Sequence, residues 1–139
     1  MGKVHTTNYY NTFIEIAEDC PLIQGEVPPL KGDKRSVANQ QFDLLSQNPY
    51  RYSSDDILFM IFAERNGIAS AEQAEARQQF FAKGQPCFRS SPLAKRYAWG
   101  VHYDADGKMA IYPAGSDEYE RYSADPSLTQ IKAMRSKRA

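Results

Sequence analysis

The chain has 139 residues, and its 17 Lys and Arg residues balance its 17 Asp and Glu residues, so the formal net charge is zero. A neutral chain has no global field that would attract nucleic acid or an anionic membrane surface. With 42% hydrophobic and 24% charged residues, the composition is that of an ordinary globular protein. The length is typical of one domain, so we expect residues 1–139 to fold as a single domain.

The apolar segments of the chain are all short. The first ten residues contain no apolar run of the kind found in secretory signals. The longest apolar stretch, Ile57 to Ala63, is much shorter than the roughly 20 residues needed to cross a bilayer. We therefore expect a cytoplasmic protein without a membrane partner, in which Cys20 and Cys87 are reduced thiols.

The first regular element is predicted at Phe13–Ala17, where β-branched residues alternate with other side chains in the pattern of a strand. Residues 21–33 follow, with three prolines and two glycines, and this composition indicates a surface loop. Asp33 is a suitable N-cap for the helix expected next.

Apolar residues at helical spacing, Ala38, Phe42 and Leu45, predict a first helix, which Asn48-Pro49 should end. A second helix is expected to start at Ser53 or Ser54 and to run through the apolar stretch 57–63. That stretch is hydrophobic nearly all round, as in a central helix, although a buried strand has the same pattern.

A third helix is expected from Ser70, which with Gln73 has the spacing of a capping box, to about Ala82. After Gly84 the spacing of the apolar residues changes from that of a helix to that of a strand. Large residues at 99, 101 and 103 alternate with Gly100, His102 and Asp104. The Asp-Ala-Asp-Gly sequence at 104–107 and then Met109–Tyr112 follow. These features predict a β-hairpin with a short turn.

The last elements are less regular. Ser116 should begin a short helix that ends near Ser123, and residues 129–134 fit either an edge strand or a short helix. Residues 135–139 have the character of a basic, frayed end. The segregation of helices and strands along the chain predicts an α+β fold. We expect a small antiparallel sheet, made of the N-terminal strand and the C-terminal hairpin, against a layer of about three helices.

Six stretches of the chain form a combined pattern: His5–Tyr9, Thr12–Pro21, Asn48–Tyr50, Ser54–Asp56, Gly84–Cys87 and Trp99–His102. Together they resemble a family of small bacterial proteins that is classed as a domain of unknown function. The similarity covers nearly the whole chain, which is consistent with one domain, and it implies no activity and no site residue.

The segment from Lys83 to His102 is the best candidate for a site, because it concentrates cations, hydroxyls and aromatic rings. Two serines before Pro92, with basic residues one turn later, could bind a phosphate or carboxylate. The alternative is that Ser90 or Ser91 only caps a short helix that begins at Pro92. The predicted ligand-binding residues are Arg89, Ser91, Arg96, Tyr97, Trp99 and His102.

Cys87 and His102 are the candidates for catalysis, and Cys20 is a weaker one. Cys87 would need a nearby base to become a nucleophile, and its neighbours suggest a small buried residue instead. The two histidines, His5 and His102, and the two cysteines match no zinc-binding spacing, so we expect no metal and no cofactor.

We interpret the chain as a small binding module whose cleft, between the hairpin and the helices, takes an anionic small molecule or a peptide carboxylate. A Cys87- or His102-dependent hydrolase or transferase is the first alternative. A weak nucleic-acid binder is the second. It would use Lys132, Arg135, Lys137 and Arg138, but four charges on a neutral protein give only salt-sensitive binding, so we do not expect nucleic acid to be the partner.

Overall fold

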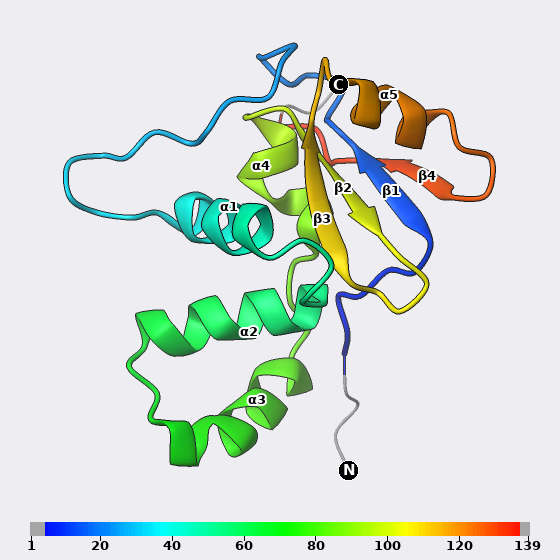
Figure 1. Ribbon diagram of the computed structural model, residues 1–139. Helices are drawn as coiled ribbons and strands as arrows, with labels where there is room; N and C mark the ends of the chain where they lie inside the picture. Colours follow the sequence, from blue (N-terminus) through cyan, green and yellow to red (C-terminus); the bar gives the residue numbers. More distant parts are fainter. Residues whose placement is uncertain (1–4, 137–139) are drawn as a thin grey trace.

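A four-stranded mixed sheet forms the centre of the protein (Figure 1). The computed structural model describes residues 5–136. Within that range the strand order is β3–β2–β1–β4. β1 pairs antiparallel with β2, β2 pairs antiparallel with β3, and β4 lies parallel to β1. The strands are β1 (Thr12–Glu15), β2 (Trp99–Tyr103), β3 (Met109–Pro113) and β4 (Thr129–Lys132).

The fold class is α+β, as predicted, but the predicted sheet is wrong in two respects. Residues 129–132 form a parallel strand, so the sheet is mixed rather than antiparallel. Helices also cover both faces: α1, α2 and α4 contribute to the core on one face, and α5 packs on the other (Figure 1). The described residues form α1 (Val37–Gln47), α2 (Ser54–Arg65), α3 (Gln73–Ala82), α4 (Pro92–Lys95) and α5 (Asp117–Ser123), with short 3₁₀ turns at Ser70–Glu72 and Phe88–Ser90.

The main hydrophobic core lies between the sheet and the helices α1, α2 and α4. Val101 and Tyr103 on β2 point into it, and the helices contribute Leu45, Ile57 and Leu93, each almost completely buried. Because neighbouring residues of a strand point to opposite faces, Gly100 and His102 lie on the α5 side. The predicted hairpin is confirmed, and it presents different residues to the two faces of the sheet.

The α5 face has a smaller core in which space is limited. Phe13 and Tyr119 pack edge to face, with ring centroids 5.1 Å apart. A Cβ atom at Gly100 would lie 2.6 Å from Phe13 Cζ and 2.6 Å from Tyr119 Cε2. A glycine is therefore required at this position so that the two rings can cross β2.

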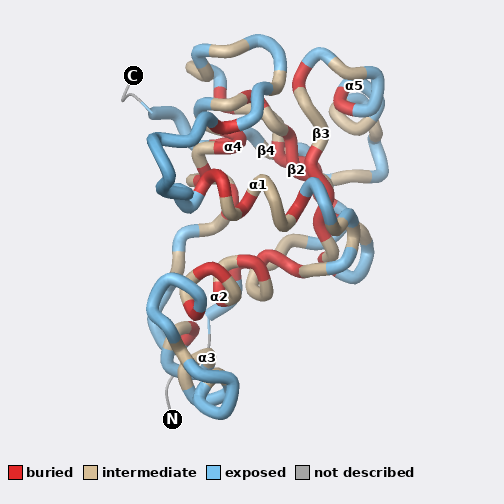
Figure 2. Tube along the Cα trace, turned by 60° about the vertical axis from the view of Figure 1, so that its left-hand side comes forward, coloured by how far each residue is buried: buried red, intermediate tan, exposed pale blue. Residues whose placement is uncertain are grey.

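Helices α2 and α3 form a hairpin that extends away from the sheet (Figures 1 and 2). Phe59, Ala63 and Phe81 make a separate hydrophobic cluster between them. The stretch 57–63 is helical, as predicted, and it is buried on two sides because Ile57 and Ile61 join the main core. A seam thus runs between the main body and the α2–α3 hairpin.

Local hydrogen bonds fix the helix starts, and two of the predicted caps are wrong. Ser36, not Asp33, caps α1, because its Oγ accepts a bond from Asn39 N at 3.2 Å. Ser70 makes no capping hydrogen bond, since α3 begins only after the 3₁₀ turn. The predicted starts at Ser53 and Ser116 are confirmed.

Cys20 and Cys87 are not disulfide-bonded. No helix in residues 5–136 has the length and the apolar character needed to traverse a bilayer. The predicted frayed basic end extends to residues 137–139, which lie outside the described part of the chain.

Candidate functional site

A hollow of about 470 Å³, which we call the cationic groove, lies between the segment 29–36, the start of α1 and α4. The chain just before this segment is anchored by hydrogen bonds to α1 and to the turn that follows α4. Asn39 Nδ2 donates to the carbonyl of Pro28 at 2.8 Å, and the Glu26 amide donates to the carbonyl of Tyr97 at 2.9 Å. The groove is lined by Lys31, Lys34, Arg35, Arg65 and Arg96 together with Pro29, Ser36, Val37, Ala38, Pro92 and Tyr97.

The charges of the groove are only partly compensated by the protein. Arg35 pairs with Asp43, and Arg65 Nη1 donates to Gln40 Oε1 at 2.9 Å. Lys31, Lys34 and Arg96, in contrast, form no ion pair with any of residues 5–136. The first turn of α1, which borders the groove, contains no acidic residue to balance the positive end of the helix dipole. The local potential is therefore positive, although the whole chain is neutral.

A second hollow of about 410 Å³, which we call the apolar cavity, lies in the seam between α1 and α2, close to the end of α3. Its wall is mostly hydrocarbon. It is lined by Val37, Leu58, Ile61, Phe62, Phe80, Pro86 and Pro92, together with Gln41, Arg65, Asn66, Gln85, Cys87, Ser90 and Ser91.

Cys87 has a hydroxyl partner but no base. Its Sγ lies 3.3 Å from Tyr9 Oη, the one side-chain hydrogen bond that Cys87 makes within residues 5–136. Burial and this hydrogen bond raise the pKa of Tyr9 to about 12, so the phenol is protonated at neutral pH and cannot accept the thiol proton. The ring of Tyr9 packs on Tyr103, on the face of the sheet that α1, α2 and α4 cover. His102 points to the opposite face, toward α5. Cys87 and His102 therefore form no nucleophile–base pair.

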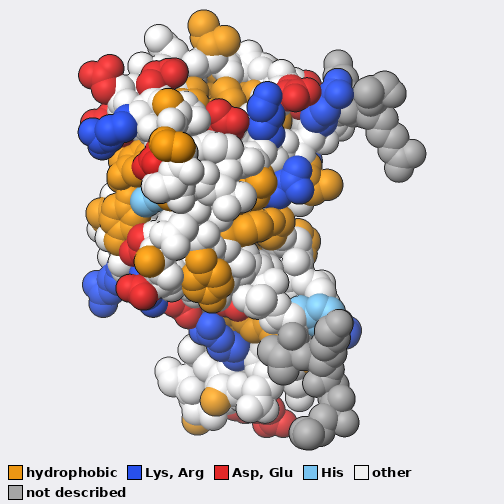
Figure 3. Space-filling view, turned by 90° about the vertical axis from the view of Figure 1, so that its right-hand side faces the viewer, with side chains coloured by type: hydrophobic (Ala, Val, Ile, Leu, Met, Phe, Trp, Pro, Cys, Tyr) orange, Lys and Arg blue, Asp and Glu red, His pale blue; other side chains and the backbone are white. Residues whose placement is uncertain are grey.

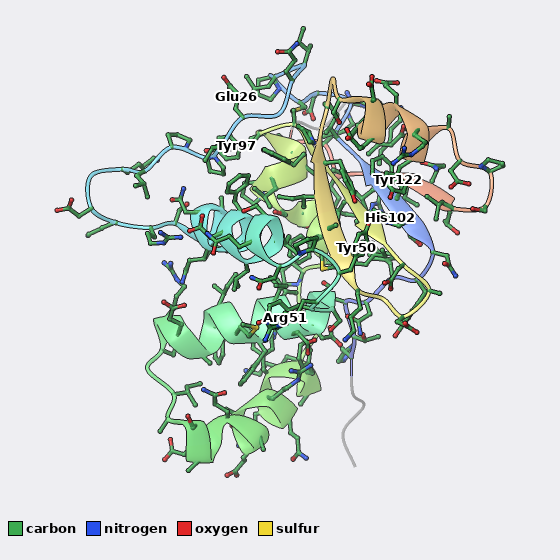
Figure 4. The ribbon with its side chains drawn as sticks, in the orientation of Figure 1. Glu26, Tyr50, Arg51, Tyr97, His102 and Tyr122 are labelled. Atoms are coloured by element: carbon green, nitrogen blue, oxygen red, sulfur yellow. The ribbon has the colours of Figure 1, made fainter. Side chains whose placement is uncertain are left out.

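Three tyrosines and His102 form a hydrogen-bonded group on the α5 side, which we call the tyrosine–histidine cluster. Tyr50 Oη lies 2.8 Å from His102 Nδ1, 2.8 Å from Tyr112 Oη and 3.4 Å from Tyr122 Oη. The ring of His102 stacks on Tyr122 at 4.2 Å (Figure 4). The strand register places His102 and Tyr112 on one face, and Tyr50 N, which donates to Met109 O at 2.7 Å, fixes Tyr50 at the β3 edge.

Burial and internal hydrogen bonding change the ionisation of this cluster. Burial lowers the pKa of His102, although the nearby carboxylates of Asp104 and Asp125 act in the opposite direction. Burial, together with hydrogen bonds to Tyr112 and Tyr122, raises the pKa of Tyr50. The hydrogen bond from Tyr50 lowers the pKa of Tyr122. The hydroxyl of Tyr50 thus joins His102 Nδ1 and the two other tyrosine hydroxyls in one hydrogen-bonded group.

The structure brings only some of the predicted ligand-binding residues together. Arg96 and Tyr97 both line the cationic groove, and Ser91 lines the adjoining apolar cavity. Ser91 Oγ accepts a bond from Leu93 N at 3.1 Å, so it makes the helix cap that was the alternative interpretation.

The other three predicted residues lie elsewhere. Arg89 Nε donates to the carbonyl of Lys132 in β4 at 2.8 Å. Trp99 packs against Phe42 of α1, on the face of the sheet that α1, α2 and α4 cover, and its Nε1 donates to Glu26 O at 2.7 Å. His102 belongs to the cluster on the opposite face, away from Tyr97 (Figure 4). One cleft lined by all six residues is therefore not present.

Sequence reasoning missed four of the five cations of the groove. Lys31, Lys34 and Arg35 fall within five positions just before α1, and this concentration was a usable signal. Arg65 gave no such signal, because only the packing of α2 beside α1 brings it to the groove. Within the described residues, no group of three or more His, Cys, Asp or Glu side chains is placed to hold a metal ion.

A family model described as "Family of unknown function (DUF6157)" matches residues 4–139. The chain belongs to this family, and the resemblance to a domain of unknown function is confirmed. No curated protein and no solved structure matches the chain. The family match thus covers nearly the whole chain but assigns no activity to it.

Proposed function

We propose that this member of a family of unknown function is a binding module for a small organic anion, and that the anion binds in the cationic groove. The observation that carries the proposal is the convergence of five Lys and Arg side chains on one hollow whose lining contains no acidic residue. Because Lys31, Lys34 and Arg96 lack an ion-pair partner among residues 5–136, they are available to a ligand.

The groove also has the components of a specific site. Guanidinium groups can bind a carboxylate or phosphate through two parallel hydrogen bonds, and Arg96 is free to do so. Tyr97 supplies an aromatic wall beside it. All five cations are on exposed residues, so the attraction is screened by salt and the affinity should fall as ionic strength rises.

Isothermal titration calorimetry with citrate, a small polyanion, tests the proposal at low and at physiological ionic strength. The groove variant carries Lys31→Ala, Lys34→Ala and Arg96→Ala. The matched control variant removes three cations that lie outside the groove, through Arg51→Ala, Lys108→Ala and Lys132→Ala.

We expect wild-type and control proteins to bind citrate, and the groove variant to bind it at least tenfold more weakly. The expected loss is about 1.4 kcal/mol, the equivalent of one decade in affinity. Equal loss in both variants would mean that net charge, and not the groove, attracts the anion. Absence of citrate binding to the wild-type protein at low salt would refute the proposed function.

A further inference from the structure

The cationic groove and the apolar cavity are neighbours. Val37, Arg65 and Pro92 line both hollows. Arg65 lies at the junction, where its Nη1 donates to the carbonyl of Arg35 at 3.2 Å and to Gln40 Oε1 at 2.9 Å, so that it links α2 to the start of α1. A ligand that enters the groove thus lies beside the mouth of a second, chemically different space.

One stripe of α2 leads from the apolar cavity toward the groove. Leu58, Ile61, Phe62 and Arg65 have the spacing i, i+3, i+4 and i+7, which places them on one side of the helix. Three of these side chains are hydrocarbon, and the charged one is at the groove end. The polarity of the surface therefore changes in one direction, from apolar at Leu58 to cationic at Arg65.

The polar side chains around the apolar cavity are all engaged inside the protein. Ser91 Oγ donates to Gln41 Oε1 at 2.6 Å, and Cys87 is held by Tyr9. Gln85 Nε2 donates to Phe80 O, Asn66 Nδ2 donates to Phe62 O, and Ser90 Oγ contacts Met134 Sδ. A hydrocarbon group in this cavity would not have to break these hydrogen bonds, which lowers the penalty for filling it.

The same cavity exposes apolar surface that the protein does not cover. Leu58, Phe62 and Phe80 are only partly buried, and Val37 at the border is 39% exposed. The seam exists because the α2–α3 hairpin has its own hydrophobic cluster and does not close fully on the main body. The volume of about 410 Å³ lies within the range of roughly 300–1,000 Å³ that is usual for small-molecule sites.

We propose that the ligand is an amphiphilic organic anion, whose acidic head group binds in the cationic groove and whose hydrocarbon tail occupies the apolar cavity. This inference rests on the proposed function, to which it adds the chemical class of the ligand. The groove supplies the charge that a carboxylate or phosphate head requires, and the cavity supplies a space in which every added methylene leaves water.

The test is a series of NMR titrations with butyrate, hexanoate and octanoate, with octanol as the neutral control and octyl phosphate as the alternative head group. We expect affinity to rise by up to about fourfold per methylene along the series, since each methylene is transferred into apolar surroundings. Octanol should bind at least tenfold more weakly than octanoate. Either octanoate or octyl phosphate binding more tightly than butyrate supports the proposal, and the tighter of the two identifies the head group.

A cavity-filling variant distinguishes binding of the hydrocarbon tail from binding of the acidic head group. Leu58→Trp places a larger side chain in the apolar cavity, and Met60→Trp makes the same change on the same helix at a residue that does not line it. We expect Leu58→Trp to abolish the gain from butyrate to octanoate and to leave citrate binding unchanged, whereas Met60→Trp keeps both.

Three results would overturn the inference. If citrate binds but octanoate binds no more tightly than butyrate, the groove acts alone, and the proposed function survives without the tail site. If octanol binds as tightly as octanoate, the cavity acts without the groove. If none of the anions binds, including citrate, the proposed function itself fails. The chain-length series alone decides the inference if Leu58→Trp does not fold.

Discussion

The tyrosine–histidine cluster and the cationic groove both gather polar side chains, but they differ in what those side chains bind. In the cluster, the hydroxyl of Tyr50 lies within 3.4 Å of three polar atoms from His102, Tyr112 and Tyr122. In the groove, Lys31, Lys34 and Arg96 have no ion-pair partner in the described part of the chain. The first group is hydrogen-bonded within itself, whereas the second contains charges that the described part of the protein does not pair.

The two regions also differ in the charged side chains that surround them. On the side of the molecule where α5 and β4 lie, acidic and basic side chains are both scattered among hydrophobic ones (Figure 3). The groove has cations and no acidic residue in its lining. We infer that satisfied polar groups on the α5 face serve stability, whereas unsatisfied charge in the groove serves binding.

Gly100→Val should have the largest effect on stability. The new side chain would meet Phe13 and Tyr119 at distances that no real Cβ contact tolerates, so α5 must shift from the sheet. We expect the free energy of unfolding to fall by about 3 kcal/mol in urea titrations. Gly84→Val is the control, because the nearest atom to a Cβ there is 3.9 Å away. Equal destabilisation by the two changes would contradict the crowding at Gly100.

Tyr50→Phe should lower the free energy of unfolding by about 1–2 kcal/mol. It removes the hydroxyl that joins His102 and Tyr112, and it leaves their half-buried polar atoms without that partner. Urea unfolding of the variant measures the loss. Tyr10→Phe, at a residue that is 54% exposed, should cause no measurable change. Citrate binding should be unaffected, and a tenfold loss of binding in Tyr50→Phe would place the ligand at the cluster instead.

The pH dependence of stability should contain a contribution from His102. Burial lowers the pKa of His102 in the folded state, so between that value and the unfolded value of about 6.5 the unfolded chain binds more protons. This contribution is present above pH 6.5 and is lost as pH falls toward the folded pKa. Urea unfolding between pH 7.5 and 5.5 should show a smaller decline in His102→Gln than in the wild-type protein. An identical decline in both would exclude His102 as a source.

The groove variant, Lys31→Ala, Lys34→Ala and Arg96→Ala, should show the smallest effect on stability. All three residues are exposed, and their side chains make no ion pair with residues 5–136, so the free energy of unfolding should change by less than about 0.5 kcal/mol. Thermal and urea unfolding measure the change. A loss above 1 kcal/mol would show that the cations support the fold, and the division between the two regions would not hold.

Local patterns predicted the elements of this fold well. The stripe of Ala38, Phe42 and Leu45, the serine at position 53 and the alternation around the 104–107 turn each depend on contacts within a few residues. The sheet was predicted less well, because nothing in residues 129–132 identifies β1 as their neighbour or makes the pairing parallel. That choice depends on contacts more than one hundred positions apart.

The candidate site shows the same limit. Arg96 and Tyr97 were selected for their composition and do line the groove, but Trp99 and His102, two and five positions beyond Tyr97, point into the core and to the opposite face. Because the side chains of a strand alternate between its two faces, Trp99 and His102 point to opposite faces and cannot line one cleft. Arg65 joins the groove only through the packing of α2, which no local pattern encodes.

The central claim is that a small anion binds to the unpartnered cations of the groove and not to the tyrosine–histidine cluster. The most direct measurement is an NMR titration of the wild-type protein with octanoate that follows the backbone amide shifts of both regions. We expect saturable shifts at residues 31–38, 62–65 and 96–97, with no change at 102, 112 and 122. Shifts confined to the second set, or spread evenly over both, would contradict it.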